Sequence, residues 1–402
     1  MGTRYPALRW PIGHLCTVHS PYYLYQFYTS PHCEKGLPVK FRCEREALAE
    51  ALSTAGRAAT GRTGALPVLS GLRLELSGDQ LSITGTDLDL TIQLTLAVGG
   101  DGDGGVVLPA RLATDIVRSM GAGKVEVIVE GDDVNISGGR SQFSVRPLSL
   151  DDYPKLATPS SSSVTLPAAA VGEALRQVVR AASTDEARPI LTGVLLTAEN
   201  GGLRMVATDS YRLAVRDLAD HEVLGADQKV LVPGRALNEL QRLVGGGDEL
   251  TMRLGDRDAT FEVGGTRLST RLIEGEFPNY RQVIPTERGQ QLLLPTETFT
   301  HALRRVALLS AERSRAVKLE LSEGQMRLSS NNPDLGDARE ELDIDFAGET
   351  TSIAFNARYL IDAVSATRSK EIRFGFRDAL SPAELSPADD ADALAVVMPM
   401  RL

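Results

Sequence analysis

The chain repeats one pattern of strands, turns and helices three times. The repeated segments begin at Leu66, Arg188 and Arg315 and read LPVLSGLRLELSGDQLSITGTDLDLTI, RPILTGVLLTAENGGLRMVATDSYRLAV and RAVKLELSEGQMRLSSNNPDLGDAREEL. Each predicts a strand, a turn containing Gly, a second strand, a polar corner and a third strand. A second motif follows each segment, VLPARLATDIVRSM, LVPGRALNELQRLV and IAFNARYLIDAVSA, in which a strand runs into a short helix. A repeat of this length indicates one supersecondary unit used three times.

Hydrophobic periodicity predicts an α+β fold for each repeat. Apolar residues alternate at Leu72, Leu74 and Leu76 and from Leu88 to Leu96, which is typical of antiparallel sheets with one buried face. Helical spacing appears in six segments, namely Leu48/Leu52/Ala55, Leu112/Ile116, Leu175/Val178/Val179, Leu237/Leu240/Leu243, Leu303/Val306 and Leu360/Ile361/Val364. Four helices are predicted to carry proline at their first position, at Pro109, Pro167, Pro233 and Pro295. Each repeat therefore has two helices and two short sheets.

Length and composition fit three domains. At about 150 residues a domain, 402 residues suggest two or three. We expect domains at 39–158, 164–285 and 291–402, because the polar stretches TPSSSSVT (158–165) and PTERGQQ (285–291) separate the repeats.

Residues 1–38 do not follow the repeat pattern. They hold the single Trp but show neither alternation nor helical spacing, so we predict a disordered extension. The segment VKFRCERE, beginning at Val39, is then an alternative start of translation. A small added subdomain is the other interpretation.

Composition excludes several classes of protein. With 42% hydrophobic and 24% charged residues, the chain is typical of soluble globular proteins, and it has no apolar run long enough to span a membrane and no secretory signal. The three cysteines, Cys16, Cys33 and Cys43, have neither metal-site spacing nor the even number of a disulfide framework. A cytoplasmic location without metal or other cofactor is the expectation.

Charge is distributed unevenly between the helices and the rest of the chain. The net charge of −10 argues against nucleic acid. However, the helical segments with their flanks hold 18 Lys and Arg against 10 Asp and Glu, whereas the remainder holds 25 against 43. This pattern favours DNA held against the helices through phosphate contacts. The alternative is that these arginines are solvated and paired with Glu173, Glu239 or Asp362 on helix faces.

Three long motifs carry a resemblance to a known family. TDSYRLAV (208–215), EGEFPNYRQVIP (274–285) and VVMPMRL (396–402), in this order within the threefold repeat, resemble the bacterial DNA sliding clamp, the beta subunit of DNA polymerase III. The resemblance covers residues 39–402. It implies three tandem clamp domains, with antiparallel sheets outside and two helices on the inner face of each, in a head-to-tail dimeric ring.

The resemblance also implies a function. The ring would encircle double-stranded DNA without sequence preference and tether the replicative polymerase. The clamp loader and other polymerases and repair proteins would bind through short linear peptides, and the chain would catalyse nothing. A closed ring holds DNA by linkage, so polymerase rebinding becomes intramolecular. A β-rich protein-interaction scaffold that never encloses DNA is the alternative.

Family positions imply DNA-facing arginines. These are Arg62, Arg111, Arg188 and Arg235, and helical position adds Arg176, Arg180, Arg304 and Arg305. The chain departs from better-known clamps at residues 185–190, where Asp185, Pro189 and Ile190 stand in place of the Gln and Tyr of some relatives.

The resemblance implies a peptide groove between the second and third domains. Its residues are Leu191, Thr208, Ser210, Tyr211, Arg212, Leu213, Pro278, Gln282, Val283, Asn356, Tyr359, Val396, Val397, Met398, Pro399, Met400, Arg401 and Leu402. Methionine is adaptable and suits a groove that serves several ligands. Because Pro399 lacks an N–H, the terminal segment is predicted to be an edge strand. An ordinary apolar last strand would explain Val396 and Val397 but not Met398, Pro399 and Met400.

The implied dimer interface joins a first-domain edge strand to the third domain. Its residues are Arg140, Gln142, Phe143, Val145, Leu308, Leu309, Asp334 and Asp337. Phe143 and Leu309 fit a buried core equally well.

Enzyme motifs are weak in this sequence. TDLDL (86–90) contains a D-x-D pair, but the corner that it occupies reads TDSYR and NNPDL in the other repeats, so a structural turn is favoured. GGDGDGG (99–105) lacks the Lys and the following helix of a P-loop, and we expect a hairpin loop. Only His221 and His301 lie within the repeats.

Overall fold

The computed structural model describes most of the three repeats. The described residues are 39–59, 66–156, 162–199, 201–219, 221, 223–225, 228–285, 289–310 and 315–401. Residues 38–402 form one compact unit. The extension 1–38, Arg62 and Leu402 lie outside the described residues, so what we predicted of them stays a prediction. No helix among the described residues is long and apolar enough to cross a membrane.

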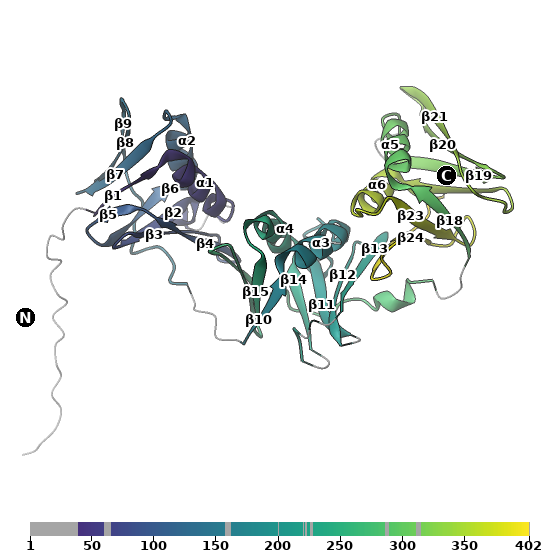
Figure 1. Ribbon diagram of the computed structural model, residues 1–402, viewed down its shortest axis with the longest axis horizontal. Helices are drawn as coiled ribbons and strands as arrows, with labels where there is room; N and C mark the ends of the chain where they lie inside the picture. Colours follow the sequence, from purple (N-terminus) through teal and green to yellow (C-terminus); the bar gives the residue numbers. More distant parts are fainter. Residues whose placement is uncertain are drawn as a thin grey trace, which may run out of the picture. The chain divides into compact units, whose positions relative to one another are not determined.

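The first domain holds two helices and nine strands in its described residues (Figure 1). They are β1 (Val39–Glu44), α1 (Arg45–Gly56), β2 (Gly71–Ser77), β3 (Gln80–Thr86), β4 (Leu90–Ala97), β5 (Gly99–Asp101), β6 (Gly104–Pro109), α2 (Ala110–Ser119), β7 (Lys124–Glu130), β8 (Asp133–Gly138) and β9 (Ser141–Val145). Both helices and both sheets contribute to one core, which contains Phe41, Leu52, Leu74 and Ile136.

The second domain repeats this order. Its elements are β10 (Ser163–Pro167), α3 (Ala168–Val178), β11 (Gly193–Glu199), β12 (Gly202–Thr208), β13 (Arg212–Leu218), β14 (Lys229–Pro233), α4 (Gly234–Leu243), β15 (Glu249–Leu254), β16 (Asp258–Val263) and β17 (Thr266–Arg271). Leu90 and Ile92 of β4 are buried in the core of this domain, so the first two domains share apolar packing.

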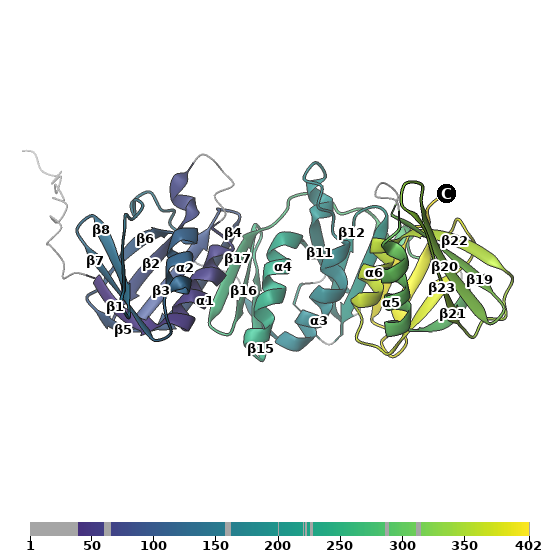
Figure 2. The same ribbon diagram turned by 90° about the horizontal axis from the view of Figure 1, so that it is seen from above.

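The third domain follows the same plan. Its elements are β18 (Gln290–Pro295), α5 (Thr296–Ala307), β19 (Ala316–Ser322), β20 (Gln325–Asn332), β21 (Gly336–Asp343), β22 (Thr351–Asn356), α6 (Ala357–Ser365), β23 (Glu371–Phe376), β24 (Ala383–Pro387) and β25 (Ala393–Val397). The six α-helices of the described residues thus fall into three pairs, as the sequence predicts (Figure 2).

Two of the four sheets run across domain boundaries. β17 of the second domain pairs with β4 of the first, which gives the order β10-β15-β16-β17-β4-β3-β2-β6. β25 of the third domain pairs with β13 of the second, which gives β14-β11-β12-β13-β25-β24-β23-β18. We call these pairings the first and the second seam. The other sheets, β5-β1-β7-β8-β9 and β21-β20-β19-β22, belong to one domain each.

The prolines before four helices are caps. Pro109, Pro167, Pro233 and Pro295 are each the last residue of a strand and the N-cap of the next helix, with φ between −54° and −60° and ψ between 116° and 128°. The expectation of a first helical position was therefore wrong by one residue. A ψ in this range is extended backbone, and the ring fixes φ near the value that such a cap adopts.

Three other local predictions were wrong. Leu88 is 39% exposed and has a φ of 81°, so it lies in a corner, and strand alternation begins only at Leu90. Leu112 is 49% exposed, so it lies outside the buried face of α2, which contains Ile116. Residues 99–105 are not a hairpin loop, because β5 pairs with β1 in one sheet and β6 pairs with β2 in the other.

The polar stretches expected to separate the domains are partly strand. β10 begins at Ser163 and β18 begins at Gln290. Their partners explain why, because β10 pairs with β15 and β18 pairs with β23 within the domains that they open.

Candidate functional site

The polar corners of the three repeats are built alike. In the first, the Asp87 carboxylate accepts hydrogen bonds from the backbone N–H groups of Asp89 at 3.2 Å and Leu90 at 2.9 Å. In the second, Asp209 accepts from Tyr211 at 2.9 Å and Arg212 at 3.1 Å.

The third corner uses an amide in place of the carboxylate. The side chain of Asn332 accepts from the backbone N–H of Asp334 at 3.0 Å. The TDLDL segment is therefore a structural turn, as predicted. Among the described residues there is no group of three or more His, Cys, Asp or Glu that could hold a metal ion.

Helix residues form ion pairs across the first seam. Arg57, which follows α1, lies 2.8 Å from Glu239 on α4, and both side chains are largely buried, at 27% and 14% exposure. Arg235 at the start of α4 pairs with Asp87 in the first corner. The second domain thus holds the first by carboxylate contacts as well as by strand pairing.

The first seam is polar on one side of its sheet. Thr86 bonds Thr91 through their hydroxyls at 2.8 Å, and Thr260 bonds Ser269 at 3.1 Å. β17 pairs with β4 in the first seam as β25 pairs with β13 in the second. When these two pairings are aligned, Ser269 and Thr270 of β17 correspond to Val396 and Val397 of β25.

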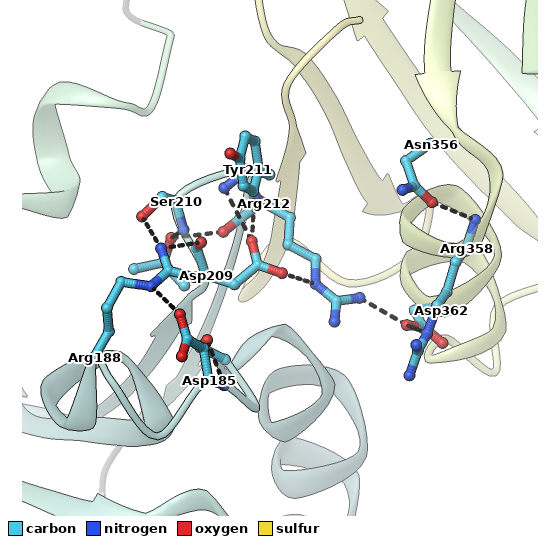
Figure 3. A network of polar contacts seen from close by, with 11 residues as sticks. Asp185, Arg188, Asp209, Ser210, Tyr211, Arg212, Asn356, Arg358 and Asp362 are labelled. Carbon is cyan, nitrogen blue, oxygen red and sulfur yellow. Dashed lines mark hydrogen bonds and ion pairs between the residues drawn. The ribbon is translucent and has the colours of Figure 1, made fainter. Parts of the chain in front are cut away.

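Arg212 forms the centre of the second seam (Figure 3). Its guanidinium donates to Asp209 at 3.0 Å and to Asp362 of α6 at 2.7 Å, and it stacks 4.5 Å from the centre of the Tyr359 ring. Arg180, which follows α3, lies 3.7 Å from the same Asp362. Two ion pairs and one cation–π contact fix the position of the Arg212 guanidinium, and Arg212 in turn holds Asp209, Asp362 and Tyr359 in place.

Arg188 approaches the second corner from the other side (Figure 3). It donates to Asp185 at 3.0 Å and to Ser210 Oγ at 3.4 Å. A backbone N–H from Ala187 and the Arg188 guanidinium together lower the pKa of Asp185. Asp185 therefore orients Arg188.

The helix arginines proposed to face DNA differ in whether a carboxylate of the chain neutralises their charge. Arg111 is 97% exposed, with Asp115 at 3.8 Å, and Arg304 bonds the neutral Ser365 at 3.2 Å. In contrast, Arg305 is bound bidentately to Glu340 at 2.7 and 3.1 Å, which raises the pKa of Arg305 and lowers that of Glu340.

Helix carboxylates also pair with neighbouring arginines, as the alternative interpretation anticipated. Glu173 pairs with Arg176, Glu239 with Arg242, and Asp362 with Arg358. These interactions do not exclude DNA contact, but they leave Arg111 and Arg304 as the least compensated of the described candidates.

The residues predicted for the peptide groove gather around β13, β25 and the start of α6. Leu191, Leu213, Val396 and Val397 are buried, whereas Tyr211 is 60% exposed. Pro278 and Gln282 are exposed in the segment after β17, and Val283 packs on the apolar cluster that contains Leu213 and Val396. Thr208 bonds the backbone oxygen of Arg212 at 2.6 Å, and Asn356 caps α6 by accepting from Arg358 at 3.0 Å.

The prediction of an edge strand at the C-terminus was wrong. β25 lies between β13 and β24 and is a central strand, which accounts for the buried Val396 and Val397. The strand ends at Val397, before Pro399. Beyond it, Met398 donates its N–H to Tyr211 at 2.9 Å and Met400 donates to Ala354 at 2.7 Å, and both side chains are half-buried. Arg401 is exposed.

Comparison with known proteins identifies the family. Sequence profiles for the N-terminal, central and C-terminal domains of the DNA polymerase III beta subunit match residues 39–157, 165–279 and 281–401. The chain belongs to this beta-subunit family. A beta sliding clamp from Escherichia coli strain K12 is 34% identical over 368 residues, 90% of this chain and 100% of that protein. One from Streptomyces coelicolor is 34% identical over 376 residues, with the same coverage.

Solved structures agree with this assignment. The sliding clamp (DNA polymerase III subunit beta) of Pseudomonas aeruginosa, crystallised with griselimycin, has a TM-score of 0.83 and 30% identity, and the match covers 91% of this chain and 100% of that one. The three tandem clamp domains predicted from the sequence are thereby confirmed.

β9 and β21 are two of the edge strands of the four sheets in the described residues. β9 and β21 each pair on one side only within the described residues. Among the predicted interface residues, Val145 is buried, Phe143 is half-buried against the first-domain core, Leu309 is half-buried, and Leu308 is 79% exposed. Arg140, Gln142, Asp334 and Asp337 are exposed at or beside these edges.

Sequence reasoning missed Arg57, Asp87 and Arg118. Arg118 on α2 bonds Ser53 on α1 at 2.7 Å, which mirrors the contact of Arg304 with Ser365 between α5 and α6. Arg57 was detectable, because it follows Leu52 by five residues, just as Arg180 follows Leu175.

Proposed function

We infer that the chain is the processivity clamp of DNA polymerase III: two copies close head to tail into a ring around duplex DNA and tether the polymerase without catalysing a reaction themselves. The observation that carries this inference is the unpaired edges of β9 and β21, taken with family membership.

The internal seams support the ring. Each seam joins the last strand of one domain, β17 or β25, to the third strand of the repeated segment in the domain before it, β4 or β13. By the same rule β9 of one copy would pair with β21 of the other. A head-to-tail contact of this kind generates a ring when the rotation closes.

We call the proposed pairing of β9 with β21 between two copies the third seam. The helix positions support an apolar contact there. Leu308 follows Leu303 by five residues, the spacing that places Arg57 and Arg180 at the internal seams. Leu308 and Leu112 are among the most exposed large apolar side chains of the described residues. We propose that the interface comprises Arg140, Gln142, Phe143, Val145, Leu308, Leu309, Asp334 and Asp337, together with Leu112.

The proposed DNA contacts are electrostatic. Arg62, Arg111, Arg188, Arg235, Arg176, Arg180, Arg304 and Arg305 remain the proposed set, and Arg118 joins them. Phosphate contacts give affinity without sequence information and allow sliding. Retention would then come from linkage rather than from tight binding.

The proposed partner site is the groove at the second seam. We propose that the polymerase catalytic subunit, the clamp loader and other polymerases and repair proteins bind there through short peptides. Support comes from the exposed Tyr211 and the half-buried Met398 and Met400 above an apolar cluster. We also propose domain limits of 39–158, 164–285 and 291–402 and a cytoplasmic location, where the polymerase works.

DNA topology tests the function. Protein loaded by the clamp loader should stay on nicked circular DNA and leave after linearisation. Equal retention on both forms would favour the alternative, a scaffold that does not encircle DNA.

A further inference from the structure

A second pocket adjoins the predicted peptide groove. It has a volume of about 300 Å³ and lies between Val283 and Ile284, in the segment after β17, and the strands β18, β23 and β24. Phe374 and Leu385 of these strands are buried in the third-domain core. Gly375 and Glu384, one residue away on each strand, line the pocket, so it opens on the sheet face opposite the helices.

One carboxylate in this pocket has no partner among the described residues. Arg281 pairs with Glu199 at 2.9 Å, and Arg377 bonds Asp378 at 3.1 Å and Ser381 at 2.8 Å. The carboxylate of Glu384 has neither a hydrogen bond nor an ion pair with any described residue. Burial raises the pKa of Glu384.

The backbone next to Glu384 leaves room for a ligand. Gly375 is the register partner of Glu384 on β23, and a methyl group on Gly375 would lie 3.5 Å from the Glu384 carboxylate. The carboxylate therefore extends over a position that has no side chain. A partly desolvated carboxylate with open space beside it favours an ammonium or guanidinium group.

The pocket is continuous with the groove. Gln282 and Val283, which belong to the predicted groove, also line the pocket. Glu384 is the register partner of Val396, another groove residue, on the adjacent strand. Adjacent strands lie about 4.8 Å apart, so a bound peptide needs only one or two further residues to pass from one site to the other.

We propose that this pocket is a subsite of the partner groove in which Glu384 binds a lysine or arginine that flanks the apolar anchor of the partner peptide. The subsite rests on the proposed function of the groove. It would make the clamp prefer partners whose motif carries a basic residue at this flank, so charge would rank peptides with similar apolar anchors.

Peptide titrations test the subsite. The probe is the groove-binding peptide of the polymerase subunit, with each flanking residue in turn replaced by Lys, Gln or Glu. At one flank position, Lys should bind the full chain about fivefold more tightly than Gln, as expected for one partly exposed ion pair. This preference should vanish with Glu384→Gln and should reverse in favour of Glu with Glu384→Lys.

Glu323→Gln provides the matched control, because Glu323 is an exposed glutamate in a turn of the same domain. The Lys preference should persist in this variant. A preference that survives Glu384→Gln, or that never appears, would overturn the subsite while leaving the groove intact. Failure of the parent peptide to bind the unaltered chain would overturn both. A crystal structure of the Lys complex gives an independent readout, since its Nζ should lie within about 4 Å of Glu384.

Discussion

Arg57 and Glu239 form an ion pair of 2.8 Å between the first two domains, and Arg180 and Asp362 repeat it at 3.7 Å between the second and the third. Both arginines follow a core leucine by five residues, and both carboxylates follow a helix cap by six. The residues at the corresponding positions of α5 and α2 are Leu308 and Asp115. A leucine and an aspartate cannot form an ion pair.

The Arg57–Glu239 pair is expected to stabilise the first seam modestly. Replacing both residues by alanine, singly and together, should give a coupling free energy of about 1 kcal/mol, since the pair is largely but not fully buried. Thermal unfolding of the four proteins measures it, and 1 M NaCl should reduce it. Arg242→Ala in place of Arg57→Ala is the control, because Arg242 bonds Glu239 from an exposed position on the same helix. Zero coupling at low salt would contradict this role.

Arg304 and Arg305 are predicted to contribute unequally to DNA binding. Arg304→Ala should weaken binding to a duplex and reduce the slope of log affinity against log salt by about one. Arg305→Ala should have a smaller effect, because Glu340 already neutralises Arg305. Fluorescence titration at several salt concentrations distinguishes them. Equal losses would show that the Glu340 pair opens on DNA.

The register of the proposed ring interface can be tested by crosslinking. If the third seam follows the internal pairings, Ser144 of one copy lies opposite Asp337 of the other. Ser144→Cys with Asp337→Cys should then form an intersubunit disulfide on oxidation, because directly paired residues lie within disulfide range. Gel electrophoresis without reductant detects the product.

The control pairs Ser141→Cys with Asp337→Cys, which is displaced by about 10 Å along the strand. Cys16 and Cys33 are replaced by serine in both proteins, and Cys43 is buried. Crosslinking of the control alone would show a different register.

Removal of residues 398–402 should abolish peptide binding and spare the fold. The deleted segment follows β25 and contributes two described backbone hydrogen bonds, from Met398 and Met400. Met398→Ala should weaken binding by about 1 to 2 kcal/mol, as for an interface anchor. Calorimetry measures the binding, and Leu335→Ala, at an exposed leucine away from the groove, serves as control. Unfolding of the truncated chain would instead assign the tail to the core.

Glu384→Gln should raise the melting temperature at neutral pH. The folded pKa of Glu384 is raised, so ionisation above that pKa costs stability that the amide does not lose. Below the unfolded pKa, near 4.3, the carboxyl is protonated in both states and the difference should disappear. Melting curves from pH 4 to 8 measure it. A variant that is less stable at pH 7 would indicate an unseen partner for Glu384.

Sequence patterns predicted the elements better than the corners between them. Leu72, Leu74 and Leu76 are all buried on one sheet face, as alternation requires. Leu88 continued the same alternation in the sequence but lies in a left-handed corner, because Asp87 caps the turn. Periodicity records side-chain polarity and contains no information on a local positive φ.

The pairing of charged residues could be predicted only in part. Pairs within one helix, such as Arg176 with Glu173, follow from spacing along the sequence. The double contact of Arg212 depends on the pairing of β13 with β25, which brings α6 of another domain alongside. Similarly, no local signal distinguishes Glu384, which is half-buried and has no partner among the described residues, from the exposed glutamates of the chain.

The continuity of the sheets across both seams has an evolutionary consequence. Main-chain hydrogen bonds join β4 to β17 and β13 to β25 whatever side chains these strands carry, so the duplicated domains stay docked while their seam residues diverge. The two seams carry different side chains at equivalent positions, hydroxyl groups at Ser269 and Thr270 and apolar groups at Val396 and Val397. When a domain of this architecture is duplicated within a chain, the chain gains a second seam. One seam can then evolve a binding site for partner proteins while the other keeps the domains joined.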